Sequence, residues 1–379
     1  RSGYTLVDRM PKRDDIEYQQ WLEEKRENDL SRKKSFLFDG SRLPKIHCLV
    51  CVDNDGLSEL ANTIDSMGAQ DYENWHLSVI SHLSCPDEMF YEVSQLSWLQ
   101  VEQQHDLQTL LINLDVQAEW FGFLEAGDYL EPHALSSCVE YLKKNPEWKV
   151  IYSDEDRVSS DGFFHSPRFK PDFNLDFFYS VGYIGGFVLF KTESLNELDG
   201  IKFLAPVISD DLVLNYLDLF GKHVIGHIEN ILMHRQDSID ELILSQSGIR
   251  QHVLSEHFVR NNSEAIIEPG FQPGSFYIKF PVKQQVLVSI IISTNNELKF
   301  LRQCIDSIFE KTTYDNYELI IVDNQSDDPE LLSYLKGLDE NNSKIKLISY
   351  SQEFNYAEIN NLAVEQTAGS HIVLLNNDT

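Results

Sequence analysis

The sequence is poor in cysteine and in basic residues. Its 5 cysteines among 379 residues are too few and too scattered for the disulfide framework of a small secreted domain. Lysine and arginine number 31 against 61 aspartates and glutamates, which gives a formal net charge of -30. A field of that sign repels polyphosphate chains and anionic lipid, so we expect no nucleic acid as a partner.

Long apolar runs are also missing. No stretch reaches the roughly 18 apolar residues that a membrane-spanning helix needs, and the chain does not open with a signal peptide. The sequence therefore predicts a soluble, cytoplasmic protein. The basic cluster at 25–34 is interrupted by Glu27 and Asp29, and we interpret it as a solvated helix face. Peripheral association with membrane machinery at the inner face of the cytoplasmic membrane is the alternative.

The closely spaced cysteines Cys48 and Cys51 lie in the apolar run KIHCLVCV, which predicts a buried strand. Side chains of a strand alternate between its two faces, so positions 48 and 51 point in opposite directions. We therefore expect neither a disulfide nor a shared metal between them.

What the sequence does contain is an alternation of apolar strands and amphipathic helices. A hydrophobic content of 42% over this length is enough for two globular domains. The alternation is typical of an α/β fold with a mainly parallel sheet and helices on both faces. From Pro44 onward we expect strands at 46–52, 76–80, 120–124 and 149–153, and helices at about 57–68, 105–117 and 132–144.

Composition predicts four segments. Residues 1–43 are predicted as a polar helical extension, in which Tyr18, Trp21 and Leu22 pack onto the domain that follows. A first domain spans 44–270, a Pro/Gly-punctuated connector covers 271–287, and the strand pattern restarts over 288–379.

The second half of the first domain begins with a stretch rich in Pro, Gly and aromatic residues, FKPDFNLDFFYSVGYIGGFVLFK. It lacks clean periodicity and predicts turns with a short antiparallel piece. A helix after Ser209, a strand at 223–228 and a helix at about 241–261 are expected to follow.

The chain contains an internal repeat. TIDSMGAQDYENWHLSV and CIDSIFEKTTYDNYELII share Ile-Asp-Ser and a Tyr-acid-Asn-aromatic motif, at offsets of 306 − 65 = 241 and 316 − 74 = 242 positions. So consistent an offset indicates a duplicated domain. With Asn74 opposite Asn316, the aspartate Asp323 falls opposite Ser81, so the first copy has lost an acid.

The run from VSIIISTNNELKFLRQCIDSIF through YELIIVDNQSDD to HIVLLNNDT resembles family 2 glycosyltransferases of the GT-A fold, of the bacterial polysaccharide and O-antigen type. The first copy resembles the same family at IYSDEDRVSSDGFFHSPRFKPDF and at GHIENILMHR. The resemblance implies one complete GT-A domain and the nucleotide-binding half of a second. A generic dinucleotide binder is disfavoured, because no Gly-rich phosphate loop follows the first strand of either copy.

In the second copy the resemblance implies a site for a nucleotide-diphosphate sugar. Asp378 would bind Mg²⁺ or Mn²⁺, with Asn376 at the ribose or the metal, since oxygen ligands suit such hard cations. Asp323 would accept hydrogen bonds from the base or ribose, while Thr294 and Asn296 line the same cleft at the carboxyl ends of the strands. An ordinary polar turn and a helix cap are the alternatives for these motifs.

In the first copy the corresponding positions depart from the pattern. Glu125-Ala126-Gly127 stands where the second copy has Asn376-Asn377-Asp378, so Glu125 and Asp128 are candidate metal ligands only if the turn shifts by one residue. An exposed acidic turn is the alternative. Asp53, at the end of the first strand, is the candidate for cofactor binding, and His234 for the metal, with a polar pair at a strand end as its alternative.

The resemblance places a general base near Ser209-Asp210-Asp211, and Asp210 and Asp211 are the catalytic candidates. The alternative is that Ser209 caps a helix whose first turn carries the two acids. Asp154-Glu155-Asp156 is either an element on the acceptor side or a solvated acidic loop.

The function implied is an inverting, metal-assisted glycosyltransferase that extends a cell-surface polysaccharide, acting on a glycan or lipid-linked glycan acceptor. A non-catalytic glycan-binding or scaffolding module is the alternative, above all for the first domain. Because the second copy lacks its base-carrying half, we expect the natural protein to continue beyond Thr379.

Overall fold

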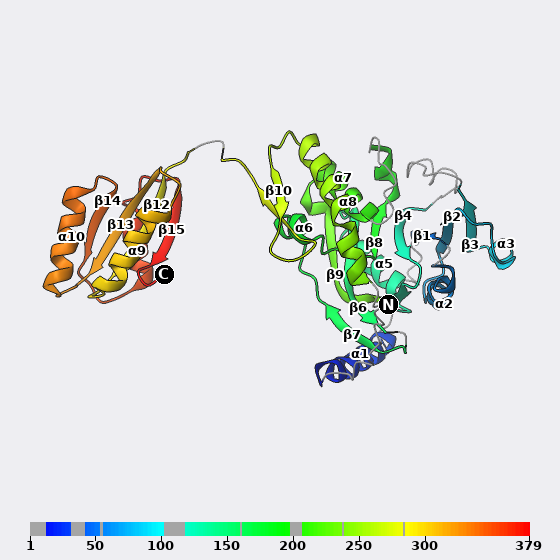
Figure 1. The fold of residues 1–379 in the computed structure, drawn as a ribbon. Coiled ribbons are helices and arrows are strands. Elements are labelled where there is room, and N and C mark those ends of the chain that lie inside the picture. Colours follow the sequence, from blue (N-terminus) through cyan, green and yellow to red (C-terminus); the bar gives the residue numbers. More distant parts are fainter. Residues whose placement is uncertain are drawn as a thin grey trace, which may run out of the picture. The chain divides into compact units, whose positions relative to one another are not determined.

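The computed structural model describes residues 13–31, 42–53, 56–101, 118–159, 161–197, 207–236, 239–282 and 285–379. The chain forms two compact units, Arg1–Phe280 and Pro281–Thr379 (Figure 1). Their boundary falls within the range 271–287. Across the described ranges, no helix combines the length and the apolar character needed to cross a membrane.

The first unit is built on a mixed sheet with the strand order β3-β2-β1-β4-β8-β6-β9-β5. One half, from β3 to β4, is parallel, and β6 and β9 are also parallel to each other. The antiparallel members are β5, β7 and β8, which agrees with the antiparallel piece expected after the fourth strand. The strands are β1 (Ile46–Val52), β2 (Trp75–Ser81), β3 (Leu96–Gln100), β4 (Trp120–Glu125), β5 (Tyr129–Leu130), β6 (Val150–Val158), β7 (Phe164–Arg168), β8 (Val188–Lys191) and β9 (Ile225–Gln236).

Helices cover both faces of this sheet, which confirms the predicted α/β class. On one face α2 (Leu60–Gly68) and α5 (Ala134–Lys144) enclose a core with Cys48 of β1. On the other face α6 (Leu175–Val181), α7 (Ile208–Phe220) and α8 (Ile239–Arg260) enclose a second core, against which Cys51 packs. The two cysteines are free and face opposite sides, as their spacing predicts. A short helix, α3 (Met89–Glu92), precedes β3.

Local sequence explains several of these elements. The buried residues of α5 recur three to four positions apart, among them Leu135, Val139 and Leu142, which is the pattern of an amphipathic helix. The side chain of Asn174 caps α6, and Gly182 ends it in the left-handed conformation at φ 55°. The helix predicted at about 105–117 lies outside the described residues.

The helix α1 (Arg13–Ser31) packs against the first unit as the sequence predicts. Tyr18 and Leu22 are buried in a small cluster with Ile231. Trp21 is 39% exposed and stacks on Tyr18, with 5.7 Å between the ring centroids. A hairpin of β10 (Ile266–Pro269) and β11 (Phe276–Lys279) ends the unit.

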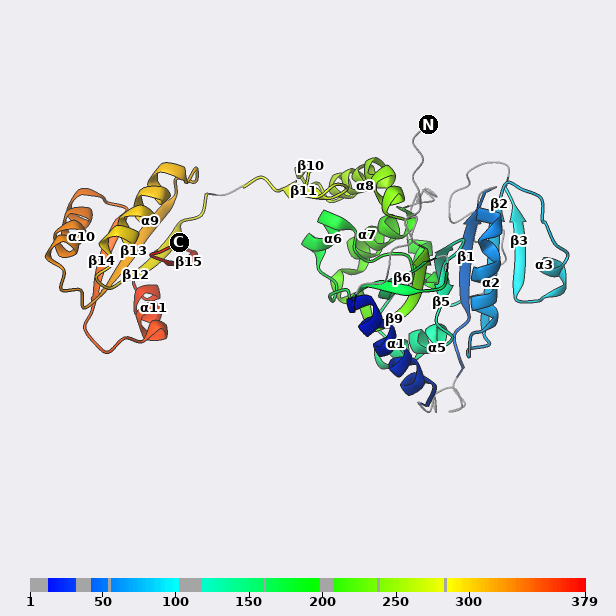
Figure 2. The ribbon, with the colours of Figure 1, turned by 60° about the horizontal axis from the view of Figure 1, so that its bottom comes forward.

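The second unit is a parallel sheet of order β14-β13-β12-β15 with helices on both faces (Figure 2). One face packs against α9 and α10, and the other packs against α11. The elements are β12 (Val288–Thr294), α9 (Leu298–Lys311), β13 (Tyr317–Asn324), α10 (Pro329–Asn341), β14 (Ile345–Tyr350), α11 (Tyr356–Val364) and β15 (His371–Asn376).

The two units share the same local architecture where the sequence repeats. The order β3-β2-β1-β4 in the first unit has its counterpart in β14-β13-β12-β15 of the second. The Asn74 side-chain amide donates to the carbonyl of Leu43 at 2.9 Å, and the Asn316 amide donates to the carbonyl of Gln285 at 2.7 Å. The Tyr72 hydroxyl donates to the carbonyl of Pro44, and the Tyr314 hydroxyl donates to the carbonyl of Val286. The repeated motif therefore fixes the entry of the first strand onto its neighbour and has a structural role.

Gly122 of β4 provides a test of the sheet packing. A Cβ at this position would overlap the carbonyl oxygen of Val188 on β8 and lie 2.7 Å from Leu189 Cδ2. Gly122→Ala is expected to destabilise the first unit by about 1–3 kcal/mol, the usual cost of overpacking. Gly68→Ala is the control, because nothing lies within 4 Å of its Cβ.

Urea unfolding followed by tryptophan fluorescence measures this effect. All 5 tryptophans precede residue 150, so the signal reports on the first unit alone. Equal midpoints for the two variants would contradict the packing described for β4 and β8.

Candidate functional site

In the second unit, the predicted site residues meet at one edge of the sheet. Thr294 and Asp323 are register partners at the ends of β12 and β13, and Asn376 ends β15 next to Ser293. Asp378 follows two residues later. The carboxyl ends of three adjacent parallel strands therefore present these side chains together, which is where open α/β sheets bind ligands.

The loops after β12 and β13 are tied to each other. The Asn296 backbone N–H donates to Ser326 Oγ at 3.0 Å, and its side-chain oxygen accepts from the backbone N–H of Asp327 and Asp328 at 2.9 and 3.0 Å. Asn296 adopts φ 55°, in the left-handed region that asparagine tolerates. Asn296 thus holds the two loops in place, a structural role that its spacing in the sequence did not reveal.

Asp323 and Asp378 are the two acids at this edge that the sequence predicts as site residues. Asp323 Oδ1 accepts a hydrogen bond from the Ser326 backbone N–H at 3.2 Å. Neither acid forms an ion pair with any Lys, Arg or His of the described ranges. The neighbouring Asn324 has its side-chain Oδ1 buried without a hydrogen-bond partner. Carboxylate and amide oxygens such as those of Asp378 and Asn376 fit a hard divalent cation, which binds through few protein ligands when substrate phosphates complete its shell.

The first unit has a different arrangement at the end of β4. Asp128 is buried and its Oδ2 accepts from the Glu125 backbone N–H at 2.7 Å. Arg235 of β9 lies beside both acids, with its Nη2 3.0 Å from Glu125 Oε1 and its Nε 3.8 Å from Asp128 Oδ1. Burial raises the pKa of Asp128 to about 7, although the Arg235 charge opposes the shift. The two predicted metal ligands thus already share a cation.

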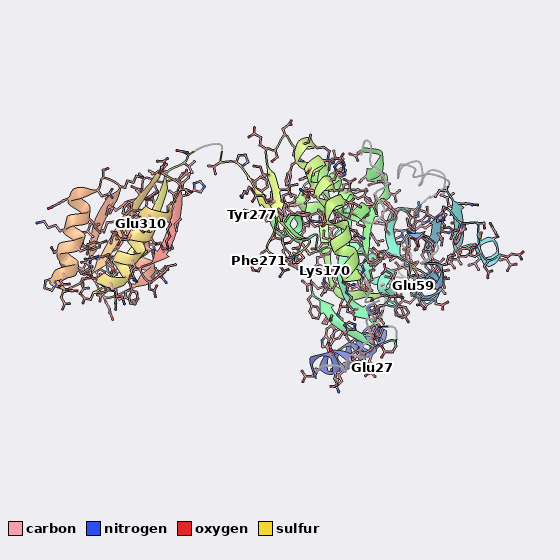
Figure 3. All side chains as sticks on the ribbon, viewed as in Figure 1. Glu27, Glu59, Lys170, Phe271, Tyr277 and Glu310 are labelled. Atoms are coloured by element: carbon pink, nitrogen blue, oxygen red, sulfur yellow. The ribbon has the colours of Figure 1, made fainter. Side chains whose placement is uncertain are left out.

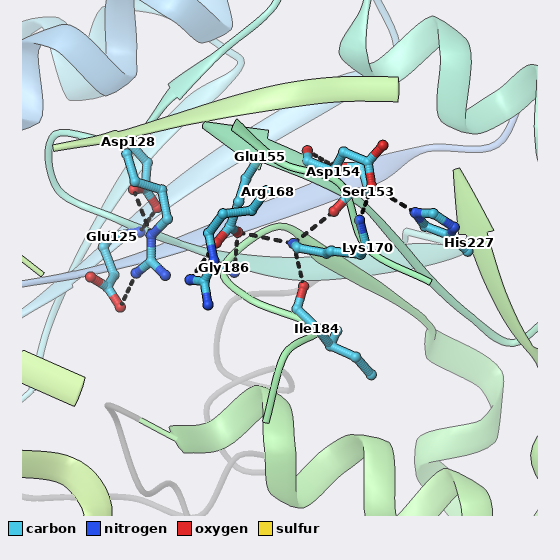
Figure 4. A network of polar contacts seen from close by, with 11 residues as sticks. Glu125, Asp128, Ser153, Asp154, Glu155, Arg168, Lys170, Ile184, Gly186 and His227 are labelled. Atoms are coloured by element: carbon cyan, nitrogen blue, oxygen red, sulfur yellow. Dashed lines mark hydrogen bonds and ion pairs between the residues drawn. The ribbon is translucent and has the colours of Figure 1, made fainter. Parts of the chain in front are cut away.

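The acidic stretch at 154–156 is buried within β6 and is not the solvated loop considered from the sequence. Asp154 contacts His227 Nε2 at 2.8 Å, and Glu155 contacts the Lys170 ammonium at 3.0 Å. Figure 4 shows Lys170 between Glu155 and the carbonyls of Ser153 and Ile184, to which it donates at 2.7 and 2.6 Å. Burial opposes ionisation of Glu155, but the Lys170 and Arg168 charges hold its pKa down at about 2.

Lys170 is buried in the first unit, whereas Phe271 and Tyr277 near the hairpin are exposed (all three are labelled in Figure 3). The paired glycines at 185–186 make room for the buried charges. A Cβ at Gly185 would lie 2.6 Å from Lys170 Nζ, and one at Gly186 would lie 3.3 Å from the Arg235 guanidinium. Gly185 is thus explained by its close approach to the Glu155–Lys170 ion pair, whereas a Cβ at Gly186 would first meet Met233 Cε at 2.7 Å.

His234 is not placed with Glu125 and Asp128, which corrects its predicted metal role. Its Nε2 lies 2.7 Å from Glu131 Oε1 and its Nδ1 contacts Asp156. Both ring nitrogens are therefore occupied by carboxylates, which leaves no lone pair for a metal. Burial disfavours the charge, but the bonds to Asp156 and Glu131 outweigh it and raise the His234 pKa. No group of three or more His, Cys, Asp or Glu in the described part of the chain is arranged to hold a metal ion.

Asp210 and Asp211 lie in the first turn of α7, and both are engaged by other groups. Asp210 Oδ2 accepts from Arg250 Nε at 2.7 Å, and Asp211 Oδ1 accepts from the Asn215 amide at 2.9 Å. Burial raises the pKa of both acids. The helix begins at Ile208 without a side-chain cap, so the expected cap at Ser209 is wrong.

Asp53 at the end of β1 closes a local turn, since its Oδ1 accepts from the Gly56 backbone N–H at 3.1 Å. The buried cations Arg235, Lys170 and Arg250, which pair with acids of the first unit, were not among the site residues predicted from the sequence. The partners lie on different elements of the fold, so no local spacing reveals the pairs.

The His234 ion pairs predict a pH dependence of stability. A histidine whose pKa is raised in the folded state stabilises fully below its unfolded pKa of about 6.5 and loses this contribution as pH rises through the folded value. The first unit should therefore become less stable as pH rises above about 6.5. His234→Gln should lower its stability at pH 6 by about 3 kcal/mol, because two buried carboxylates lose a partner, and should flatten the alkaline decline.

Urea midpoints from tryptophan fluorescence between pH 6 and 9 check this. His252→Gln is the matched control, because that side chain is 59% exposed and its loss should leave the profile unchanged. An unaltered decline in His234→Gln would show that another group causes it.

Part of this chain is similar to a known protein family, and most of it is similar to two longer proteins. Residues 289–379 match the family described as Glycosyl transferase family 2. An uncharacterized protein y4gI of Sinorhizobium fredii is 27% identical over 352 residues, covering 88% of this chain and 39% of that protein. O-antigen biosynthesis protein RfbC of Myxococcus xanthus is 26% identical over 363 residues, covering 89% of this chain and 27% of that protein. The chain thus spans less than half the length of these relatives.

Solved structures of S. aureus TarS are also similar. One TarS structure matches with a TM-score of 0.39 and 14% identity over 58% of this chain and 44% of that chain. TarS 1–349 in complex with UDP-GlcNAc matches with a TM-score of 0.40 and 13% identity over 56% of this chain and 71% of that chain. The match over residues 289–379 lies within the second unit, Pro281–Thr379, so this unit is similar in sequence to family 2 glycosyltransferases.

Proposed function

We propose that this chain is part of a glycosyltransferase that moves a sugar from a nucleotide-diphosphate donor to a growing polysaccharide, and that its second unit binds the donor. The observation that carries the proposal is the meeting of Thr294, Asp323, Asn376 and Asp378 at the carboxyl edge of β12, β13 and β15. This edge lies within the family-matched residues 289–379.

Each side chain at this edge has a distinct role in the proposal. Asp323 accepts hydrogen bonds from the base or ribose; within the described residues only its Oδ1 accepts a hydrogen bond, from the Ser326 backbone N–H. Thr294 lines the donor site beside Asp323, and its Oγ1 accepts a hydrogen bond from the Asn377 side-chain amide at 3.4 Å. Asn376 and Asp378 hold Mg²⁺ or Mn²⁺, which when bound would neutralise charge on the diphosphate leaving group.

The acceptor is proposed to be a glycan or lipid-linked glycan, reached by peripheral association with membrane machinery at the inner face of the cytoplasmic membrane. The name of the M. xanthus relative, an O-antigen biosynthesis protein, supports this class of acceptor. Transfer with inversion requires a general base. In the first unit, the candidates Asp210 and Asp211 are held by Arg250 and Asn215, so neither is free as a base in this conformation.

For the first unit, a non-catalytic role in scaffolding or glycan binding is the second candidate. One observation favours it: the acids predicted for its site are paired with cations of the same unit, as Glu125 is with Arg235 and Glu155 with Lys170. Acids neutralised in this way are less able to act on a donor.

Donor binding by the second unit is tested with Asp323→Asn in the whole chain. Calorimetric titration with UDP, GDP and dTDP in the presence of Mn²⁺ should show binding of at least one nucleotide, weakened about 10-fold or more by the substitution. This is the size expected when one hydrogen bond to a charged group, worth about 1.5–3 kcal/mol, is lost.

Asp315→Asn is the matched control, because Asp315 precedes the opposite end of β13 and is exposed. The Asp315→Asn chain should bind the nucleotide with the same affinity as the unaltered chain. Equal affinities for Asp323→Asn and Asp315→Asn would place the nucleotide elsewhere.

A further inference from the structure

The end of β4 in the first unit carries a guanidinium between two carboxylates. Arg235 Nη2 lies 3.0 Å from Glu125 Oε1, and Nε lies 3.8 Å from Asp128 Oδ1. The Asp128 side chain is 2% exposed and that of Arg235 is 7% exposed, whereas Glu125 is 44% exposed. The buried cation is therefore paired with one buried carboxylate, that of Asp128, and with one half-exposed carboxylate, that of Glu125.

Arg235 is fixed in this place by the sheet. Its backbone is in register with Arg157 of β6 along the parallel β6–β9 pair. A Cβ added at Gly186 would lie 3.3 Å from Nε and Cζ of the guanidinium and 2.7 Å from Met233 Cε. Arg235 Nε is buried and has no hydrogen-bond partner. Burying an N–H without a hydrogen-bond partner costs free energy. The ion pairs with Glu125 and Asp128 offset this cost.

Within the described residues of the first unit, no carboxylate pair beside Arg235 is left open for a divalent cation. Such a cation would have to share Glu125 and Asp128 with a buried guanidinium, and the two cations would repel each other strongly at this distance. The adjacent acids offer no replacement, since Glu155 is held by Lys170 at 3.0 Å and by Arg168 at 3.2 Å. The described residues include no cluster of three acids, histidines or cysteines around a common centre.

We propose that Arg235 is the built-in cation of the first unit: it occupies the position between Glu125 and Asp128, makes the unit independent of divalent metal, and blocks a latent metal site. Removing the guanidinium leaves a four-residue pair of carboxylates with oxygen ligands suited to Mn²⁺ or Mg²⁺. The inference concerns the first unit alone and does not rest on donor binding by the second.

Mn²⁺ binding to the whole chain tests this, with free Mn²⁺ counted by electron paramagnetic resonance. Asp378→Asn serves as the parent, because it removes the metal ligand proposed in the second unit while leaving the first unit intact. The parent is expected to show no Mn²⁺ binding that depends on Glu125. Arg235→Met in this parent should gain one equivalent of bound Mn²⁺, and adding Asp128→Asn should abolish the gain.

Arg235→Lys is the matched control, because it keeps a positive charge at the site and should gain no Mn²⁺. Tryptophan fluorescence and circular dichroism establish whether each variant is folded. A folded Arg235→Met chain that binds no more Mn²⁺ than the parent would overturn the proposal.

A second arm decides the matter if Arg235→Met fails to fold. Glu125→Gln alters a half-exposed side chain in the parent and leaves Arg235 in place. If the parent binds Mn²⁺ and Glu125→Gln releases it, the carboxylate pair accepts a metal despite Arg235 and the proposal fails. If Mn²⁺ binding is absent, or persists unchanged in Glu125→Gln, the pair is closed to metal as proposed.

Discussion

Charge buried in a sheet has to be paired, and the first unit is organised around this constraint. Glu155 and Asp156 on β6 are 1% and 0% exposed, and an unpaired carboxylate at such depth would be strongly unfavourable. Their partners come from separate segments: Lys170 follows β7, and His234 lies on β9. The Tyr18 hydroxyl of α1 also bonds Asp156. The pairing thus joins β6, β9 and the N-terminal helix into one body.

The two units show what a duplicated scaffold keeps and what it changes. Both keep the hydrogen bonds of Asn74 and Asn316 that set the first strand against its neighbour. The acid at the end of the second strand differs: Asp323 presents a carboxylate, whereas Ser81 donates to the carbonyl of Val52 and accepts from the Leu83 N–H. A hydroxyl is sufficient to close this turn, so the fold of the first unit does not require the missing acid.

Much of the fold could be predicted from the sequence, because strands and amphipathic helices have characteristic local patterns of apolar residues. The strand at 46–52 has its predicted bounds, and the opposite faces of Cys48 and Cys51 follow from a period of two. In the second unit the meeting of Thr294, Asp323 and Asn376 at one edge could also be predicted, since the carboxyl ends of adjacent parallel strands lie side by side. In the first unit the metal role of His234 could not be corrected without the structure, because its carboxylate partners lie on β6 and beside β5.

Acidic motifs alone are a poor guide to metal sites in this chain. Glu125 and Asp128 have the residue types and spacing of a hard-ion site, yet the occupant of the space between them is set by β9. The backbone position of Arg235 is set by the parallel register of β6 and β9. In the second unit, Asp378 is held by no such cation among the described residues. Whether an acid at a strand end is available to a ligand thus depends on which basic side chain the next strands bring to it.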